Sequence, residues 1–126
     1  MNIETVTKNN IAIGIVAENK PAIANVQAAL DLVVEAKYQA GANRIAIPKE
    51  ALAPEFFVLS TTLAGEILQK WVVYGVKAAI YGDFSAYTSK PLKDFMYECN
   101  LGSSFFFTAT KEEAIEKLAA APGPQC

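Results

Sequence analysis

The sequence contains no histidine. This absence excludes Ser-His-Asp and Cys-His catalysis, and it excludes the usual zinc sites that contain histidine. The seven glycines form neither a G-x-G-x-x-G pattern nor a Walker loop, so no backbone cradle for a dinucleotide or a nucleoside triphosphate is indicated. We therefore expect no cofactor, no bound metal and none of the familiar catalytic groups.

The chain also has few cysteines, no long apolar runs and no large excess of either charge. Two cysteines are too few for an extracellular disulfide framework, and the apolar stretches are too short to cross a bilayer. Eleven basic and thirteen acidic residues are scattered along the chain, without a basic stripe that would neutralise phosphates. The N-terminal residues lack the basic and apolar run of a secretory signal. We expect a cytoplasmic protein that binds neither membranes nor nucleic acid.

The length and the apolar content suit one domain with a real core, since about half of the 126 residues are apolar. We expect this domain to span residues 1–120. Residues 121–126, which contain two prolines and a glycine, are expected to form a flexible tail.

The hydrophobic period switches repeatedly between two and 3.6 residues, which is typical of alternating strands and helices. We expect strands at residues 3–7, 11–16, 44–48, 76–81 and 104–108. We expect helices over residues 21–41, from Ser60 or Thr61 to residue 75, from Ser89 onward and from Thr110 onward. The order ββαβαβαβα predicts an α/β fold in which an N-terminal hairpin leads into a mostly parallel sheet covered by helices.

The first two helices each show one apolar face and one polar face. In the first helix, Val33 and Val34 belong to the predicted buried face. In the second helix the predicted buried residues are Leu63, Ala64, Ile67, Leu68, Trp71 and Val72. The opposite stripe consists of Thr62, Glu66, Gln69, Lys70 and Val73. We interpret this stripe as a solvated surface or as an interface.

Polar residues follow two predicted strands at their carboxyl ends, which is the edge where open α/β sheets bind ligands. Lys49 comes after one strand, and Asp83 and Ser85 come after another. These three residues are our candidates for ligand binding. Asp83 also suits a base, but an aspartate after a glycine is ordinary turn chemistry, and we favour the turn.

Ser60 and Thr61 place hydroxyl groups at the expected start of the second helix. Backbone N–H groups at a helix start favour a phosphate, so both residues are candidates for phosphorylation. Helix capping also explains hydroxyls at such a position, and we favour capping over phosphorylation.

Five blocks of the chain resemble a known family. They are AALDL (residues 28–32), EFF (55–57), LAGEILQK (63–70), AIYGDFSAYTSKPLKDFMYE (79–98) and EEAIEKL (112–118). Together they resemble the bacterial proteins grouped as domain of unknown function 4180, a family without agreed catalytic residues. The element order also resembles the STAS (anti-sigma-factor antagonist) fold, in which a hydroxyl at the start of the second crossover helix can be phosphorylated. That resemblance implies the comparable role for Ser60 or Thr61.

The chain departs from the family pattern at four positions. Where the family usually reads FFDL, TGLAGE and NY, this chain has Val58, Thr62 and Val73, and Leu101 stands where the family usually has a polar or basic residue. Apolar substitution of an exposed stripe is typical of a protein contact surface. We therefore predict an interface that consists of Val58, Thr62, Glu66, Gln69, Val73 and Leu101.

Three functions fit these observations. The first is a non-catalytic binding or regulatory module that contacts a protein partner, or a second copy of itself, through the second-helix surface. The second is an engineered scaffold whose surface was made apolar for assembly or partner binding. The third is a small-molecule enzyme that uses Asp83 as acid or base, which requires a strongly shifted pKa. We rank them in this order.

Overall fold

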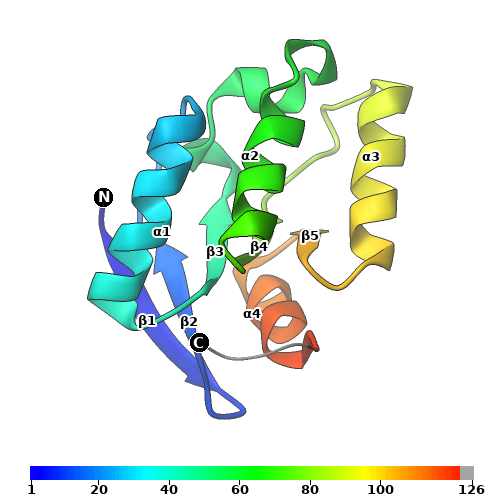
Figure 1. Cartoon of the computed structure of the whole chain (residues 1–126). Coiled ribbons are helices and arrows are strands. Elements are labelled where there is room, and N and C mark those ends of the chain that lie inside the picture. Colours follow the sequence, from blue (N-terminus) through cyan, green and yellow to red (C-terminus); the bar gives the residue numbers. More distant parts are fainter. Residues whose placement is uncertain (123–126) are drawn as a thin grey trace.

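The computed structural model describes residues 1–122 as one sheet with helices on both faces (Figure 1). The strands are β1 (Ile3–Lys8), β2 (Ile11–Val16), β3 (Arg44–Pro48), β4 (Lys77–Tyr81) and β5 (Phe105–Thr108). The α-helices are α1 (Val26–Ala40), α2 (Leu63–Val73), α3 (Lys90–Leu101) and α4 (Lys111–Ala120). Three short 3₁₀ helices, η1 (Lys49–Ala51), η2 (Pro54–Phe57) and η3 (Leu59–Thr61), connect β3 to α2. The predicted α/β fold and its element order are confirmed.

The strands lie in the order β1-β2-β3-β4-β5, and only β1 is antiparallel to its neighbour. The turn between β1 and β2 has positive φ angles at Asn9 (55°) and Asn10 (65°). Two consecutive left-handed residues match the right-handed twist of the flanking strands, and asparagine tolerates this conformation well. The predicted hairpin is therefore confirmed together with its local cause.

The helices form one layer on each face of the sheet. Each crossover from β2 to β5 steps to the next strand in the same direction, so the crossover helices α1, α2 and α3 lie on one face. Their buried residues form the larger core cluster, which includes Leu32, Ile67 and Trp71. Helix α4 covers the other face. Strand residues on that side include Ala46 and Ala79, whose small side chains let α4 lie close to the sheet.

Helix α1 begins later than the periodicity predicts. Asn25 is its N-cap and accepts a hydrogen bond at 2.8 Å from the backbone N–H of Ala28. Ile23, which we placed on the first helix, forms an isolated parallel bridge with Leu52 and is buried. The apolar spacing before Val26 therefore reflects burial beside a neighbouring segment, and the expected start at residue 21 is wrong.

Helix α2 also begins later than expected. Ser60 and Thr61 belong to the 3₁₀ helix η3, and the α-helix starts at Leu63. The predicted buried face is correct for Ala64 and the residues that follow it, except Val72, which is exposed. Val34 on α1 is likewise 57 % exposed. Both valines continue an apolar run along their helices, but they lie on the exposed side.

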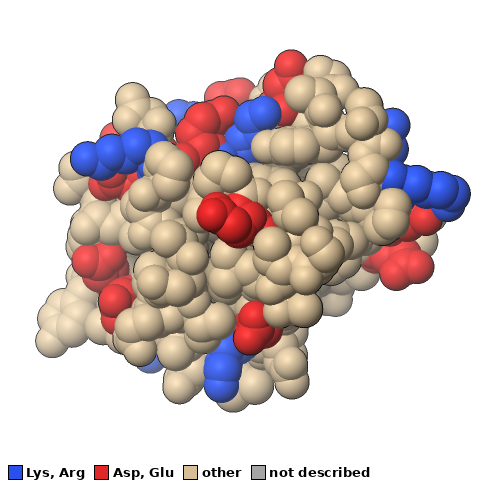
Figure 2. Space-filling model, turned by 90° about the horizontal axis from the view of Figure 1, so that it is seen from above, with Lys and Arg blue, Asp and Glu red and all other residues tan. Residues whose placement is uncertain are grey.

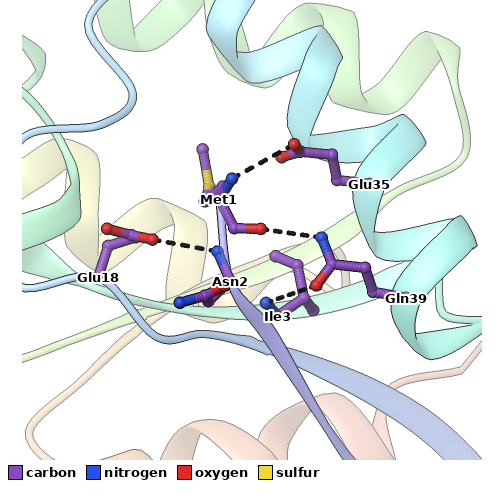
Figure 3. A network of polar contacts seen from close by, with 6 residues as sticks. All are labelled: Met1, Asn2, Ile3, Glu18, Glu35 and Gln39. Atoms are coloured by element: carbon purple, nitrogen blue, oxygen red, sulfur yellow. Dashed lines mark hydrogen bonds and ion pairs between the residues drawn. The ribbon is translucent and has the colours of Figure 1, made fainter.

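A carboxamide side chain covers the free edge of β1 (Figure 3). Gln39, from the last turn of α1, donates through Nε2 to the backbone oxygen of Met1 at 2.8 Å, and its Oε1 accepts from the backbone N–H of Ile3 at 3.0 Å. These backbone groups point away from β2, so Gln39 takes the place that a further strand would occupy. Nearby, the Met1 amino group lies 3.4 Å from a carboxylate oxygen of Glu35.

A second carboxamide side chain covers the opposite edge of the sheet in the same way. Asn100, near the end of α3, accepts through Oδ1 from the backbone N–H of Phe107 at 2.7 Å and donates through Nδ2 to the Phe107 carbonyl at 3.2 Å. Exposed strand edges are templates for pairing with other chains, and natural sheets protect them. Asn100 therefore closes the edge of β5.

We expect Asn100→Ala to lower the free energy of unfolding by about 1 kcal/mol, because both edge hydrogen bonds are lost. The Phe107 amide should also exchange its proton faster, which NMR-detected hydrogen exchange measures. Glu98→Ala, an exposed change on the same helix, is the control. Unchanged exchange of the Phe107 amide in Asn100→Ala would show that Asn100 does not protect this edge.

Of the predicted tail, residues 121–126, the structure describes only Ala121 and Pro122. Ala121 is buried, and its backbone oxygen accepts a hydrogen bond from Arg44 at 2.8 Å. Residues 123–126, where the flexible tail was also expected, lie outside the described part of the chain.

Candidate functional site

The loops after β3 and β4 meet at the carboxyl edge of the parallel strands. Lys49, the first residue after β3, donates a hydrogen bond through Nζ to the backbone oxygen of Asp83, which follows β4. The same ammonium group lies 5.1 Å from the centre of the Tyr87 ring, within the range of a cation–π contact. The structure thus brings Lys49 and Asp83 together, as their positions after neighbouring strands predict.

Gly82 makes the close approach of these loops possible. Its φ angle is 152°, and a Cβ at this position would lie 2.8 Å from Cγ of Lys49. Because both the backbone conformation and the packing disfavour a side chain, Gly82 holds the aliphatic part of Lys49 against the loop.

Asp83 behaves as a turn residue. Its Oδ1 accepts a hydrogen bond from the backbone N–H of Ser85 at 2.9 Å, which closes a short turn. Hydrogen bonds from Ser85 lower the pKa of the Asp83 carboxyl, and the nearby Lys49 charge lowers it further. A general base that works near neutral pH needs the opposite shift. The geometry therefore favours the turn interpretation of Asp83 and Ser85 over acid–base catalysis.

Aromatic rings border the Lys49 ammonium group. Tyr87 stacks on Phe57 with the ring centres 4.9 Å apart and an angle of 15° between the planes, and Phe84 lies beside both rings. Lys49, Phe57 and Tyr87 line a hollow of about 270 Å³. Figure 2, which looks onto this end of the molecule, shows mostly uncharged surface with scattered charges of both signs. The hollow is small, and the hydrogen bond from Lys49 to the Asp83 carbonyl already uses part of its donor capacity.

The two phosphorylation candidates differ in their surroundings. The hydroxyl of Thr61 lies 2.8 Å from the backbone oxygens of Glu55 and Val58, so its proton is already engaged in the loop before α2. Thr61 also accepts a hydrogen bond from the backbone N–H of Leu63 at 3.3 Å, which helps to start the helix. Ser60 is exposed. Of the two hydroxyls, Ser60 is therefore the better placed for modification.

Thr62 has an unusual backbone conformation at the N-cap of α2. Its φ angle is 64°, in the left-handed region, where a β-branched residue is a genuine outlier. Its Oγ1 donates to Oε2 of Glu66 at 2.9 Å. Thr62 therefore stores backbone strain and orients Glu66, and it adds little apolar surface to the predicted interface.

We expect Thr62→Gly to raise the free energy of unfolding by about 1 kcal/mol relative to Thr62→Ala, since only glycine adopts this backbone conformation without strain. Both substitutions remove the hydrogen bond to Glu66, so their difference isolates the strain. Urea unfolding measures it. A glycine variant no more stable than the alanine variant would contradict the assignment of strain to Thr62.

The outer surface of α1 and α2 is hollowed along the line where the two helices meet. Glu66, Gln69, Lys70 and Val73 border one hollow of about 480 Å³ together with Val26. A second hollow, of about 590 Å³, lies between the C-terminal parts of the same helices. We call this surface the α1–α2 face; its residues are Val26, Val33, Val34, Lys37, Tyr38, Glu66, Gln69, Lys70, Val73 and Tyr74.

The six residues of the predicted interface do not share one surface. Glu66, Gln69 and Val73 lie together on the α1–α2 face. Val58 lies before α2, whereas Val73 lies in its last turn, and this length of helix separates them by roughly 16 Å. Leu101 is exposed at the end of a different helix, α3.

Sequence reasoning missed the apolar residues that α1 contributes to this face. Tyr38 is 88 % exposed, and Val34 precedes it by one helical turn. Tyr74, directly after α2, is also exposed and lines the same hollow. The spacing of Val34 and Tyr38 by four residues was the available signal, because it defines a second apolar line outside the buried face.

Comparison with known proteins identifies the family. The family model described as Domain of unknown function (DUF4180) matches residues 8–118. The chain belongs to this family. No curated protein and no solved structure matches this DUF4180 chain at a significant level. The matched region runs from the end of β1 to α4, so it includes both the carboxyl edge and the α1–α2 face.

Two kinds of site are not found in the part of this DUF4180 chain that the structure describes. Within residues 1–122, no group of three or more cysteine, aspartate or glutamate side chains is arranged to hold a metal ion. Over the same residues, no helix combines the length and the apolar character needed to cross a membrane.

Proposed function

We propose that this DUF4180 protein is a non-catalytic binding or regulatory module that acts through protein–protein contacts of the α1–α2 face. The observation that carries the proposal is the gathering of exposed apolar side chains, from α1 and from the end of α2, around two hollows of about 590 Å³ and about 480 Å³. Val34, Tyr38, Val73 and Tyr74 are all more than half exposed. An exposed apolar group of this kind on a soluble domain marks an interaction site.

The composition of the face suits a protein partner. Tyrosine is enriched at interfaces because its ring supplies large contact area while its hydroxyl remains able to hydrogen bond. Tyr38, Tyr74 and Lys37 all line the hollow of about 590 Å³. Apolar contacts at the centre with charges at the rim are the usual organisation of a protein interface.

The element order supports a regulatory role. The parallel sheet with three helices on one face is similar in order to the STAS fold, and Ser60 lies in the loop before α2. Phosphorylation of Ser60 would add negative charge next to the helix that carries Glu66 and Gln69, which gives a means of changing partner binding.

Site-specific photo-crosslinking in cells tests the proposal. A photoreactive phenylalanine replaces Tyr38 or Tyr74 on the α1–α2 face, and the control places it at Tyr97, which is exposed on α3. We expect protein adducts from positions 38 and 74 and few from position 97. Adducts that are absent, or equally abundant at all three positions, would overturn the assignment of function to this face.

A further inference from the structure

We propose that the outer edge of β1 pairs with the same edge of a second copy of this chain, so that the two sheets join into one continuous sheet across a two-fold axis. In this pairing the two strands are antiparallel, with Val6 of one copy opposite Val6 of the other and Glu4 opposite Lys8. The edge is separate from the α1–α2 face, so the inference goes beyond the proposed function.

Alternate residues of β1 direct their backbone groups away from β2. In an antiparallel pair, the N–H and C=O groups of each residue point together, either toward the neighbouring strand or away from it. The N–H of Ile3 donates to Gln39 on the outer side, so the odd-numbered residues of β1 face outward. Within residues 1–122, the outward N–H and C=O groups of Thr5 and Thr7 have no hydrogen-bond partner. These groups, which we call the β1 edge, can accept a further strand.

The β1 edge is open to another chain. Thr5, Thr7 and Lys8 are exposed. Strand β3 pairs with β2 only from Gly14 onward, so the turn end of the β1–β2 hairpin extends past the parallel strands. Figure 1 shows this turn projecting beyond the helices at the bottom of the view. Gln39 therefore covers the start of β1 and leaves the rest of its outer side free.

The direction of the backbone groups allows few registers, and charge selects one of them. Because only odd-numbered residues face outward, Thr5 must lie opposite an odd-numbered residue of the other copy. With Thr5 opposite Thr7, both residues find backbone partners, and the two-fold axis forms each hydrogen bond twice. This register also places Glu4 opposite Lys8. A shift of two residues places Glu4 opposite Val6 in one direction and beyond the end of the strand in the other.

The side chains that meet in this register are complementary. Glu4, Val6 and Lys8 alternate with the threonines and share the face of the sheet that α4 covers. Val6 packs against the core cluster on that face, and Nζ of Lys8 lies 3.7 Å from a carboxylate oxygen of Glu116 in α4. Apolar pairs and opposite charges directly across antiparallel strands stabilise a sheet. The pairing forms one apolar contact at the axis and one ion pair on each side of it.

The small size of the contact sets its expected strength. Each copy contributes one short strand, so the interface lies below the standard size of specific complexes. The net charge of -2 per copy imposes little repulsion on association. We therefore expect a reversible dimer with a dissociation constant of roughly 10 µM to 1 mM.

Disulfide trapping tests the register. Val6→Cys, in a chain that also carries Cys99→Ser and Cys126→Ser, places two thiols opposite one another at the axis, within reach of a disulfide. We expect a covalent dimer on mild oxidation at about 100 µM protein. Thr5→Cys in the same chain is the matched control, and it should crosslink about tenfold more slowly or less. Its thiols lie too far apart, because Thr5 is opposite Thr7 and not opposite itself.

Sedimentation velocity from about 10 µM to about 1 mM tests the association without a crosslink. Thr7→Pro removes an outward N–H that the single chain does not use, so the fold tolerates it on an edge strand. It should weaken association about tenfold or more, whereas Thr7→Ala, which keeps the N–H, should change it by less than about threefold. Lys8→Glu should also weaken association, and Lys8→Glu/Glu4→Lys should restore it, because the second change brings opposite charges together again.

Three results would overturn the inference. They are a wild-type chain that stays monomeric at about 1 mM, equal crosslinking of Val6→Cys and Thr5→Cys, and a dimer that Thr7→Pro leaves intact. The trapping experiment keeps the inference testable if Thr7→Pro does not fold, since Val6→Cys and Thr5→Cys leave the backbone hydrogen bonds unchanged. None of these results involves positions 38 or 74, so they leave the proposed function of the α1–α2 face to its own test.

Discussion

Replacing Trp71 by alanine is expected to lower the free energy of unfolding by about 4 kcal/mol. The side chain is fully buried at the contact of α2 with the rest of the larger core cluster, and its indole N–H donates to the backbone oxygen of Ala29 in α1 at 3.1 Å. Its ring centre is 6.5 Å from that of Phe105 in β5. Truncation removes apolar contacts to a helix and a strand at once and leaves a cavity, which is why the expected loss is large.

Thermal and urea unfolding measure this loss, and a loss of about 4 kcal/mol corresponds to a fall in melting temperature of about 15 °C. Trp71→Phe keeps most of the ring volume but removes the indole donor, so it should cost between about 1 and 2 kcal/mol. Val72→Ala, the exposed neighbour on the same helix, is the matched control and should change stability by less than about 0.5 kcal/mol. If Trp71→Ala proved no more harmful than Val72→Ala, the assignment of Trp71 to the core would be wrong.

Replacing Arg44 by methionine is expected to lower the free energy of unfolding by about 3 kcal/mol. Arg44 opens β3, is 1 % exposed, and donates through Nη1 to the backbone oxygens of Leu118 and Ala121. Carbonyl groups in the last turn of a helix have no partner within the helix, so a buried cation there completes the end of α4. Methionine fills the space but leaves these carbonyls without a donor.

Arg44→Lys, which keeps the charge but has fewer donors, should give an intermediate loss. Hydrogen exchange at the end of α4 should accelerate in Arg44→Met.

The charge of Arg44 also affects Lys77, which pairs with it in the sheet. Burial lowers the pKa of the Lys77 ammonium, and repulsion from Arg44 lowers this pKa further. The methionine variant should therefore raise the pKa of Lys77 toward its ordinary value, as measured by NMR titration. If Arg44→Met changed neither the pKa of Lys77 nor the free energy of unfolding, the role of Arg44 at this helix end would be refuted.

Much of the fold could be predicted because its signals are local. The Asn9-Asn10 turn, the strand Arg44–Pro48 and the helix start at Ser89 all depend on residues within a few positions of one another. The N-cap of α4 at Thr110, which accepts from the backbone N–H of Glu113 at 3.2 Å, is another such signal. The expected start of α1 was wrong because Ile23 is buried by a segment distant in the chain. The expected start of α2 was wrong because a 3₁₀ helix and the left-handed Thr62 precede the α-helix.

The two candidate surfaces, the carboxyl edge of the sheet and the α1–α2 face, could be predicted less fully than the fold. The meeting of Lys49 and Asp83 followed from the rule that parallel strands end at one edge. The α1–α2 face was only half predicted, because the contribution of Tyr38 and Val34 depends on how α1 is rotated against α2. Val58 and Leu101 were grouped with Val73 because all three are apolar departures from the family pattern, and the fold places them apart.

Periodicity and capping act over a few residues, so the sequence was sufficient to predict the element order, the hairpin and the helix starts at Ser89 and Thr110. The blocks of residues shared with the family were sufficient to predict membership of it. Long-range packing, by contrast, sets which valines are exposed, which carboxamides close the edges of the sheet, and which cation is buried. Asn100 and Arg44 have ordinary sequence surroundings, and their roles arise from backbone groups that the chain brings to them on folding. Such contacts depend on the rotation of each helix against the sheet, and packing of the whole core sets that rotation.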